Sequence, residues 1–236
     1  MNPFESDIYD INLPIQQSHQ IGDCWLLSAV YALSQSSTGL EILKEAVSDN
    51  YSETTVKFKG LDIIISIDND EITQAMKNNK YSSGSKSFII FELAFEKLRE
   101  KISRGEVVLP EEKPYYMRNK FRIFKNKLSG GRPAEAFFYL TGNIVHYISS
   151  RDYEGFAKFE ESNDIVSCCA FDVDEDFPVV DYYGNKINLF SGHAYSIKTV
   201  DKNFVSIVNP HNTDVEIFLD RLDFYTFLKA IEYCEL

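Results

Sequence analysis

Positive charge is scarce in this sequence of 236 residues, which has 24 lysines and arginines against 36 aspartates and glutamates. The formal net charge of −12 argues against binding to nucleic acid or to an anionic membrane surface, because a phosphate-binding face needs clustered lysine and arginine. The sequence also lacks the run of about 18 apolar residues that spans a bilayer, and its start has neither the basic region nor the apolar core of a signal peptide. We therefore expect a soluble protein with no nucleic-acid partner and no membrane span.

Cysteine is sparse as well. The four cysteines are Cys24, Cys168, Cys169 and Cys234. Neighbouring cysteines rarely pair, and the spacing fits neither a disulfide framework nor a zinc ribbon. Reduced thiols fit this usage best. We expect a cytoplasmic protein, or one delivered into a host cell by a route that the sequence does not reveal.

Apolar residues make up 44% of the chain, enough for a sizeable core. Apolar residues at helical intervals predict several helices, the clearest over residues 86–104, and β-branched runs between turns predict strands. The expected helices cover residues 25–33, 40–47, 86–104, 135–140, 151–161 and 220–231. The expected strands lie in a hairpin within residues 51–67 and at 165–171, 194–200, 204–208 and 215–218. Residues 105–127 lack periodicity and are expected to form an extended loop.

The segment Leu128-Ser129-Gly130-Gly131 is the best candidate for a boundary, since the chain before it reads mainly as helix and the chain after it increasingly as strand. We expect an α+β protein with a helical lobe over residues 1–129 and a β-rich lobe over residues 130–236, the two forming one unit.

A cysteine stands at the start of the first apolar helix. Gly22 and Asp23 are expected to form a turn and an N-cap, which puts Cys24 in the first helical turn. Unpaired backbone N–H groups and the helix dipole at that position favour a thiolate over a thiol. A lone cysteine there is nevertheless more often a small buried apolar residue, so its role depends on its neighbours.

A thiolate nucleophile needs a histidine to form an ion pair and protonate the leaving group, and a third group to orient the imidazole. His193 is the best candidate, because it opens the predicted strand 194–200. If the following turn is centred near Asp201, Asn209 lies opposite His193 in the hairpin. The alternative is a strand histidine and a turn-forming Asn-Pro without function.

The order of these motifs resembles the protease core of calpains, in the papain-like superfamily. The motifs are Gly-Asp-Cys-Trp-Leu-Leu-Ser-Ala at residues 22–29, Gly-His-Ala-Tyr-Ser at 192–196 and Asn-Pro at 209–210. Weaker similarity extends over residues 88–97, 128–142, 166–170 and 224–234. The order and coverage of these segments make the resemblance specific.

The resemblance implies a papain-like two-lobed fold, with Cys24 on the helical lobe facing His193 and Asn209 on the β-rich lobe. It implies a cysteine endopeptidase that hydrolyses peptide bonds of a protein substrate through an acyl-enzyme, without a cofactor. Cys24 would be the nucleophile, His193 the general acid/base and Asn209 its orienting partner. The oxyanion hole would combine the Cys24 backbone N–H with a glutamine side chain.

The sequence departs from the calpain pattern at three places. The family glutamine lies six residues before the cysteine, where this chain has Ser18, so we expect Gln17 to take its place, with Gln20 as the second choice. His211 stands where calpains have a tryptophan that shields the His-Asn hydrogen bond. The loop over residues 210–214 replaces a longer stretch that supplies calcium ligands, and no EF-hand loop is present. We therefore expect a calcium-independent enzyme without a metal.

Other functions use the same residues. Deamidases, transglutaminases and acyltransferases share the Cys-His-Asn chemistry and differ in the acceptor or the bond that breaks. A pseudo-protease would use the cleft for binding alone. Compact calpain-like cores with diverged loops resemble microbial toxin or effector modules, so a role directed at a host is a further expectation.

Overall fold

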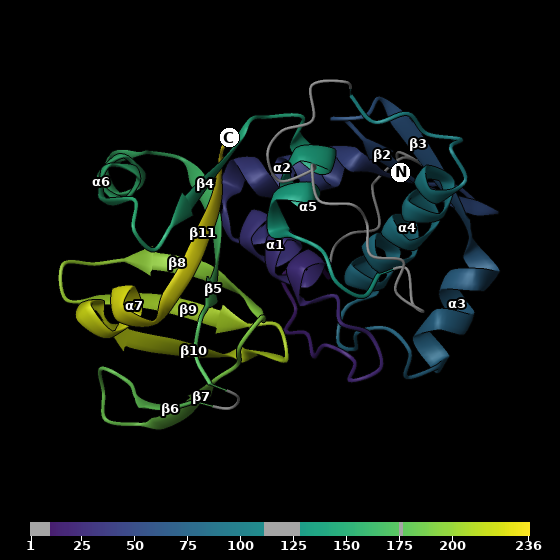
Figure 1. Ribbon diagram of the computed structural model, residues 1–236. Coiled ribbons are helices and arrows are strands. Elements are labelled where there is room, and N and C mark those ends of the chain that lie inside the picture. Colours follow the sequence, from purple (N-terminus) through teal and green to yellow (C-terminus); the bar gives the residue numbers. More distant parts are fainter. Residues whose placement is uncertain (1–9, 111–127, 175–176) are drawn as a thin grey trace.

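Most of the helices gather on one side of the molecule, and a large antiparallel sheet lies on the other, in the computed structural model of the chain (Figure 1). The structure describes residues 10–110, 128–174 and 177–236. These residues contain seven helices and eleven strands, which confirms the expectation of mixed α and β structure. Most of the predicted loop 105–127 lies outside the described residues.

Five helices follow the sequence-based expectation closely, and one was missed. The expected helices are α1 (Cys24–Gln35), α2 (Ser37–Ala46), α4 (Lys86–Ser103), α5 (Pro133–Thr141) and α6 (Tyr153–Glu161). Helix α3 (Asn69–Lys77) was not predicted, because only Ile72 and Ala75 are buried on it and its apolar stripe is too short to stand out.

Helix α1 is the central element of the molecule. Nine of its twelve residues are buried, from Trp25 to Ser34. It packs against α2 and α5 on the helical side and against two strands of the large sheet, β5 (Ile165–Phe171) and β8 (Ala194–Val200). A helix that is apolar almost all round needs such cover on most sides. The start of α1, with Cys24, therefore lies where the helical part meets the sheet.

The predicted hairpin within residues 51–67 is confirmed. Strands β2 (Glu53–Phe58) and β3 (Ile63–Asp68) pair antiparallel, and β1 (Val47–Asp49) extends them to a sheet of order β1-β2-β3. Buried and less buried residues alternate along β2 and β3, which is the pattern of a sheet with one face on a core. Helices α3 and α4 lie against this small sheet.

The large sheet has six antiparallel strands in the order β10-β9-β8-β5-β11-β4. The expected strands became β5, β8, β9 (Phe204–Asn209) and β10 (Asn212–Asp220), whereas β4 (Val145–Ser149) was missed. Strands β6 (Phe177–Val180) and β7 (Lys186–Leu189) form a separate two-stranded ribbon.

The prediction of a closing helix over residues 220–231 is wrong in its second half. Helix α7 (Arg221–Phe227) ends early, and the chain continues as β11 (Leu228–Glu235). Strand β11 lies between β5 and β4, and its residues from Ala230 to Cys234 are all buried. One face packs into the core around α1 and α5 through Cys234, and the other packs into the core beneath α6 and α7 through Ile231 and Tyr233. A strand covered on both faces loses the alternation of apolar and polar residues, and its sequence then resembles part of an amphipathic helix.

Two hydrophobic cores stabilise this arrangement. One surrounds α1, α4 and α5 and reaches the sheet through Val166, Cys168 and Ala194. The other lies between the large sheet and the helices α6 and α7, with Phe171, Tyr195 and Phe224 among its members. Within the described residues, no helix combines the length and apolar character needed to cross a membrane.

Candidate active site

Cys24 is the first residue of α1 and is partly exposed. The turn before it is tied to the loop at residues 128–131: the Gly22 N–H donates to the Ser129 hydroxyl (3.1 Å), and the Gly130 N–H donates to the Gly22 carbonyl (2.9 Å). The prediction that Cys24 lies in the first turn of a helix is confirmed.

His193 lies directly before β8, and Asn209 is the last residue of β9. His193 is 8% exposed, and its Nε2 lies 2.8 Å from Oδ1 of Asn209. Because Oδ1 accepts the hydrogen bond, Nε2 carries the proton, which leaves Nδ1 free to accept one. The structure thus brings these two predicted residues together.

The predicted hairpin register is wrong even though its two side chains meet. Ser196 pairs with Val208 and Ile197 with Ile207, and a bulge follows between Ile197 and Thr199. The turn is centred later than Asp201, since the Asp201 N–H bonds the Phe204 carbonyl. The Asn209 side chain therefore reaches His193 diagonally across the strands, rather than from the directly opposite position.

Cys24 and His193 line the same cavity of about 550 Å³. The backbone N–H of Ala194, next to His193, lies close enough to the Cys24 sulfur to lower the pKa of the thiol. No hydrogen bond joins the thiol itself to the His193 ring, both residues being among those described. The cleft therefore brings the thiol close to the strand that carries the histidine, without a direct contact in this state.

Burial controls the protonation of both groups. It raises the pKa of the Cys24 thiol to about 11, although the N–H groups of Ala194, Trp25 and Cys24 act in the opposite direction. Burial lowers the pKa of His193 to about 4, against the effect of its hydrogen bond to Asn209. At pH 7 the two residues are therefore a neutral thiol and a neutral imidazole.

Of the two candidate glutamines, Gln17 is the one held in place. It is 6% exposed, and its Nε2 donates to the Ile21 carbonyl (3.1 Å) and to Oδ1 of Asp23 (3.0 Å). Gln20 is exposed. Both residues line the cleft with Cys24. Since both N–H groups of the Gln17 amide are engaged, the amide must turn before it can donate to a substrate; its Oε1 is buried without a donor.

A stack of three histidine rings borders the cleft, and the sequence analysis did not foresee it. The His211 ring lies parallel to that of His193, with centroids 4.8 Å apart, and its other face meets His19 at 5.4 Å. The His211 backbone N–H also donates to Oδ1 of Asn209 (2.9 Å). Burial lowers the pKa of His211, and His19 lowers it further. His211 thus covers the His193–Asn209 pair.

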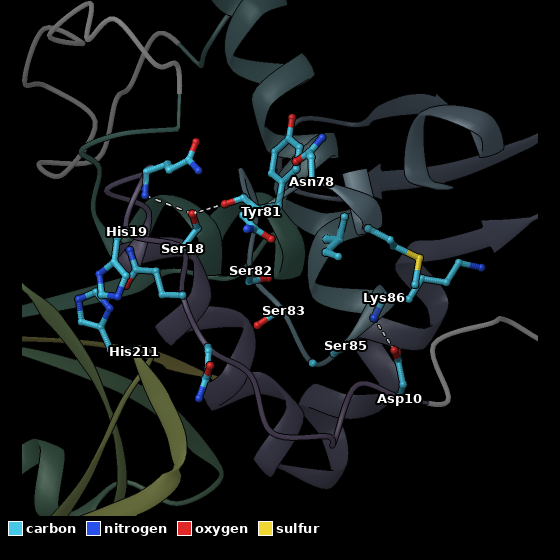
Figure 2. Close-up of a pocket in the computed structure, with 17 residues that line it drawn as sticks. Asp10, Ser18, His19, Asn78, Tyr81, Ser82, Ser83, Ser85, Lys86 and His211 are labelled. Atoms are coloured by element: carbon cyan, nitrogen blue, oxygen red, sulfur yellow. Dashed lines mark hydrogen bonds between the residues drawn. The ribbon is translucent and has the colours of Figure 1, made fainter. Parts of the chain in front are cut away.

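A second cavity of about 620 Å³ adjoins the first and shares residues 17–20 and His211 with it. Figure 2 shows His19 and His211 at one end of this cavity and Asp10 and Lys86 at the other. Hydroxyl and amide side chains form much of its wall, among them Asn78, Asn79, Ser82, Ser83 and Ser85. The two cavities meet at the histidine stack.

No family model matches this chain, and a search of curated proteins finds no match. Over residues 10–110, 128–174 and 177–236, no group of three or more His, Cys, Asp or Glu side chains is placed to hold a metal ion.

Proposed function

We propose that the protein is a cysteine endopeptidase of the papain-like, calpain type, acting on a protein substrate without a metal cofactor. The observation that carries the proposal is the arrangement of Cys24, His193 and Asn209: a helix-start thiol and a histidine line one cleft, and the asparagine holds the histidine in the tautomer that can accept a proton.

The mechanism follows from which atoms of Cys24 and His193 can give or accept a proton. The Cys24 thiol gives its proton to Nδ1 of His193 as the sulfur attacks the substrate carbonyl carbon. The negative charge that develops on the carbonyl oxygen is stabilised by the Cys24 backbone N–H at the positive end of α1. His193 then protonates the departing amine, and water releases the acid from the acyl-enzyme with His193 as the base.

Gln17 is the proposed side-chain donor of the oxyanion hole. Release of its hydrogen bond to the Ile21 carbonyl would free one N–H for the substrate oxygen, while Asp23 keeps the other. The buried position of Gln17 favours it over the exposed Gln20, because a buried side chain loses less conformational freedom when it binds the substrate oxygen.

Binding without catalysis is the competing function. Two observations favour it: no hydrogen bond joins the Cys24 thiol to the His193 ring, and the Gln17 amide donates elsewhere. The same cleft would then hold a peptide as a ligand. Hydrolysis remains the better explanation, because a binding cleft has no need for an asparagine that sets the tautomer of a buried histidine.

A thiol-directed epoxide probe tests the proposal. We expect the wild-type protein to be labelled at Cys24 and the Cys24→Ala variant to remain unlabelled, because Cys168, Cys169 and Cys234 are buried and act as internal controls. His193→Ala should slow the labelling at neutral pH, since the base that takes the thiol proton is lost. Equal labelling of wild type and Cys24→Ala would overturn the assignment of the nucleophile.

A substrate screen separates the reactions that share this chemistry. Wild type and Cys24→Ala are incubated with a host proteome, and mass spectrometry identifies the changed peptides. New amino termini that require Cys24 support peptide hydrolysis. Deamidated or cross-linked glutamines without new termini would instead assign a different acyl transfer.

A further inference from the structure

Two carboxyl groups lie completely buried behind the proposed nucleophile. Asp23 comes from the turn before α1 and Glu92 from the middle of α4, and each is 0% exposed. Their side chains lie close enough to interact, since each carboxyl group shifts the pKa of the other. Within the described part of the chain, no lysine, arginine or histidine forms an ion pair with either of them.

The other contacts of the pair are to neutral donors. Both carboxyl oxygens of Glu92 accept from the Ser82 backbone N–H, at 3.0 and 3.1 Å, and Oε2 also accepts from the Ser82 hydroxyl. Oδ1 of Asp23 accepts from Nε2 of Gln17 at 3.0 Å. Oδ2 of Asp23 is buried and has no donor unless Glu92 supplies one.

Two adjacent buried carboxylates without a neighbouring cation would repel each other strongly, and the binding of one proton removes this repulsion. Burial raises the pKa of Asp23 to about 6, and burial together with the Asp23 charge raises that of Glu92 well above its ordinary range. The pKa of Glu92 is the one raised further, so a proton on Glu92 would supply the donor that Oδ2 of Asp23 lacks.

We propose that Asp23 and Glu92 share one proton and act together as positioning residues for the cleft. The chain of contacts runs from Ser82 through Glu92 and Asp23 to the Gln17 amide. The backbone carbonyl of Asp23 also accepts from the N–H groups of Leu26 and Leu27, so the same residue holds the start of α1. The effect on catalysis rests on the proposed function; the shared proton does not.

The proton makes the pair sensitive to pH. The charged groups that face it are Glu96, which adds repulsion at Asp23 and is itself paired with Lys80, and Tyr81, which lies near Glu92 and donates to Glu96. The Cys24 thiol on α1 is neutral at pH 7. Above about pH 6 the native pair holds one proton that the unfolded chain does not. The folding equilibrium constant should then fall about tenfold for each pH unit through this pair alone.

A matched pair of variants tests the proposal. Glu92→Gln keeps a hydrogen-bond donor for Asp23 but cannot titrate, whereas Glu92→Leu keeps the approximate volume and removes the donor. Infrared difference spectra should show the carbonyl stretch of a protonated carboxylic acid in the wild type at neutral pH, absent from Glu92→Gln. Between about pH 6 and about pH 8, the folding equilibrium constant of wild type relative to Glu92→Gln should fall about tenfold per unit.

The rate at which the epoxide probe labels Cys24 then tests the positioning role of the Asp23–Glu92 pair. We expect Glu92→Gln to label with the epoxide probe at a rate close to that of wild type, and Glu92→Leu to label at least several-fold more slowly, so that glutamine rescues what leucine loses. Wild-type labelling in Glu92→Leu would overturn the positioning role. Absence of the protonated-acid band would overturn the shared proton. A protein that shows the band but cleaves no peptide would support the pair while contradicting the endopeptidase.

Discussion

At the scale of single residues, His211 covers the proposed catalytic pair of His193 and Asn209 with its ring. Its ring lies parallel to His193, at 1° between the planes, and its N–H shares Oδ1 of Asn209 with His193. An imidazole can shield that hydrogen bond from water as a larger aromatic ring would. It also brings a titratable group into contact with the proposed base.

Removal of the His211 ring should therefore weaken catalysis without removing any reacting atom. In His211→Ala, water reaches the His193–Asn209 hydrogen bond, whose net contribution is about 1 kcal/mol. The expected loss in kcat is roughly fivefold. His211→Trp restores the cover and should recover most of the rate. A rate in His211→Ala equal to that of wild type would show that the ring has no shielding role.

His193 should also link stability to acid pH. Its folded-state pKa of about 4 lies below its ordinary value of 6.5, so the unfolded chain binds the proton more readily than the folded one. The corresponding stability is complete above the ordinary value and is lost as the pH falls from about 6.5 to about 4. The size is about 3 kcal/mol. His193→Gln, compared with wild type by urea unfolding across this range, should lose that part of the pH dependence; parallel curves would contradict it.

At the scale of elements, α4 is connected to the wall of the cleft by one buried arginine. Arg99 pairs with Glu135 of α5 at 2.9 Å, donates to the Gly130 carbonyl at 2.7 Å and lies 4.1 Å from the centre of the Trp25 ring. The Arg99 side chain is only 6% exposed. Three elements that position the start of α1 therefore depend on this guanidinium.

Arg99→Met should destabilise the protein by about 3–5 kcal/mol, because it leaves the Glu135 carboxylate buried without its partner. Lys97→Met on the same helix is the matched control, since Lys97 pairs with Glu71 at the surface, where an ion pair contributes at most about 1 kcal/mol. Denaturant unfolding measures both. Similar losses of stability in the two variants would show that the buried Arg99–Glu135 ion pair contributes no more than the surface pair.

The elements also show what sequence patterns can predict. Helices with a long apolar face, such as α1 and α4, were found, because their own residues determine which face is buried. Strand β11 was missed, since its two faces are buried by the two hydrophobic cores, whose other members come from distant parts of the chain. The register of the β8–β9 hairpin was misjudged because its turn is centred later than Asp201, and the bulge in β8 has no periodic signal either.

At the scale of the whole molecule, hydrogen bonds join two distant parts of the chain beside the cleft, residues 17–28 and residues 194–210. Ser28 of α1 donates to the Ala194 carbonyl at 2.8 Å, and Ser196 of β8 donates to the Ser28 carbonyl at 2.7 Å. The Gln17 N–H donates to the Pro210 carbonyl at 2.9 Å. Cys24, His193 and Asn209 could be nominated from the sequence as a motif, but these cross-connections, and the Asp23–Glu92 pair behind them, became visible only in three dimensions.

These direct contacts lead to a prediction about calcium. A cleft needs a bound ion for its assembly only when its two sides do not contact each other directly. Here a reciprocal pair of buried hydrogen bonds and the packing of α1 on β5 and β8 already join the sides. We therefore predict that the rate at which the epoxide probe labels Cys24 is the same in excess chelator and in added calcium.

The control for that measurement is Ser28→Ala, which removes one of the two buried hydrogen bonds and leaves the Ala194 carbonyl without a donor, at a cost of about 1–3 kcal/mol. If the direct contacts assemble the cleft, Ser28→Ala should slow labelling while the chelator does not. Labelling that disappears in chelator and returns with Ca²⁺ would instead show that an ion completes the interface between α1 and the sheet, and would refute the proposal of a calcium-independent enzyme.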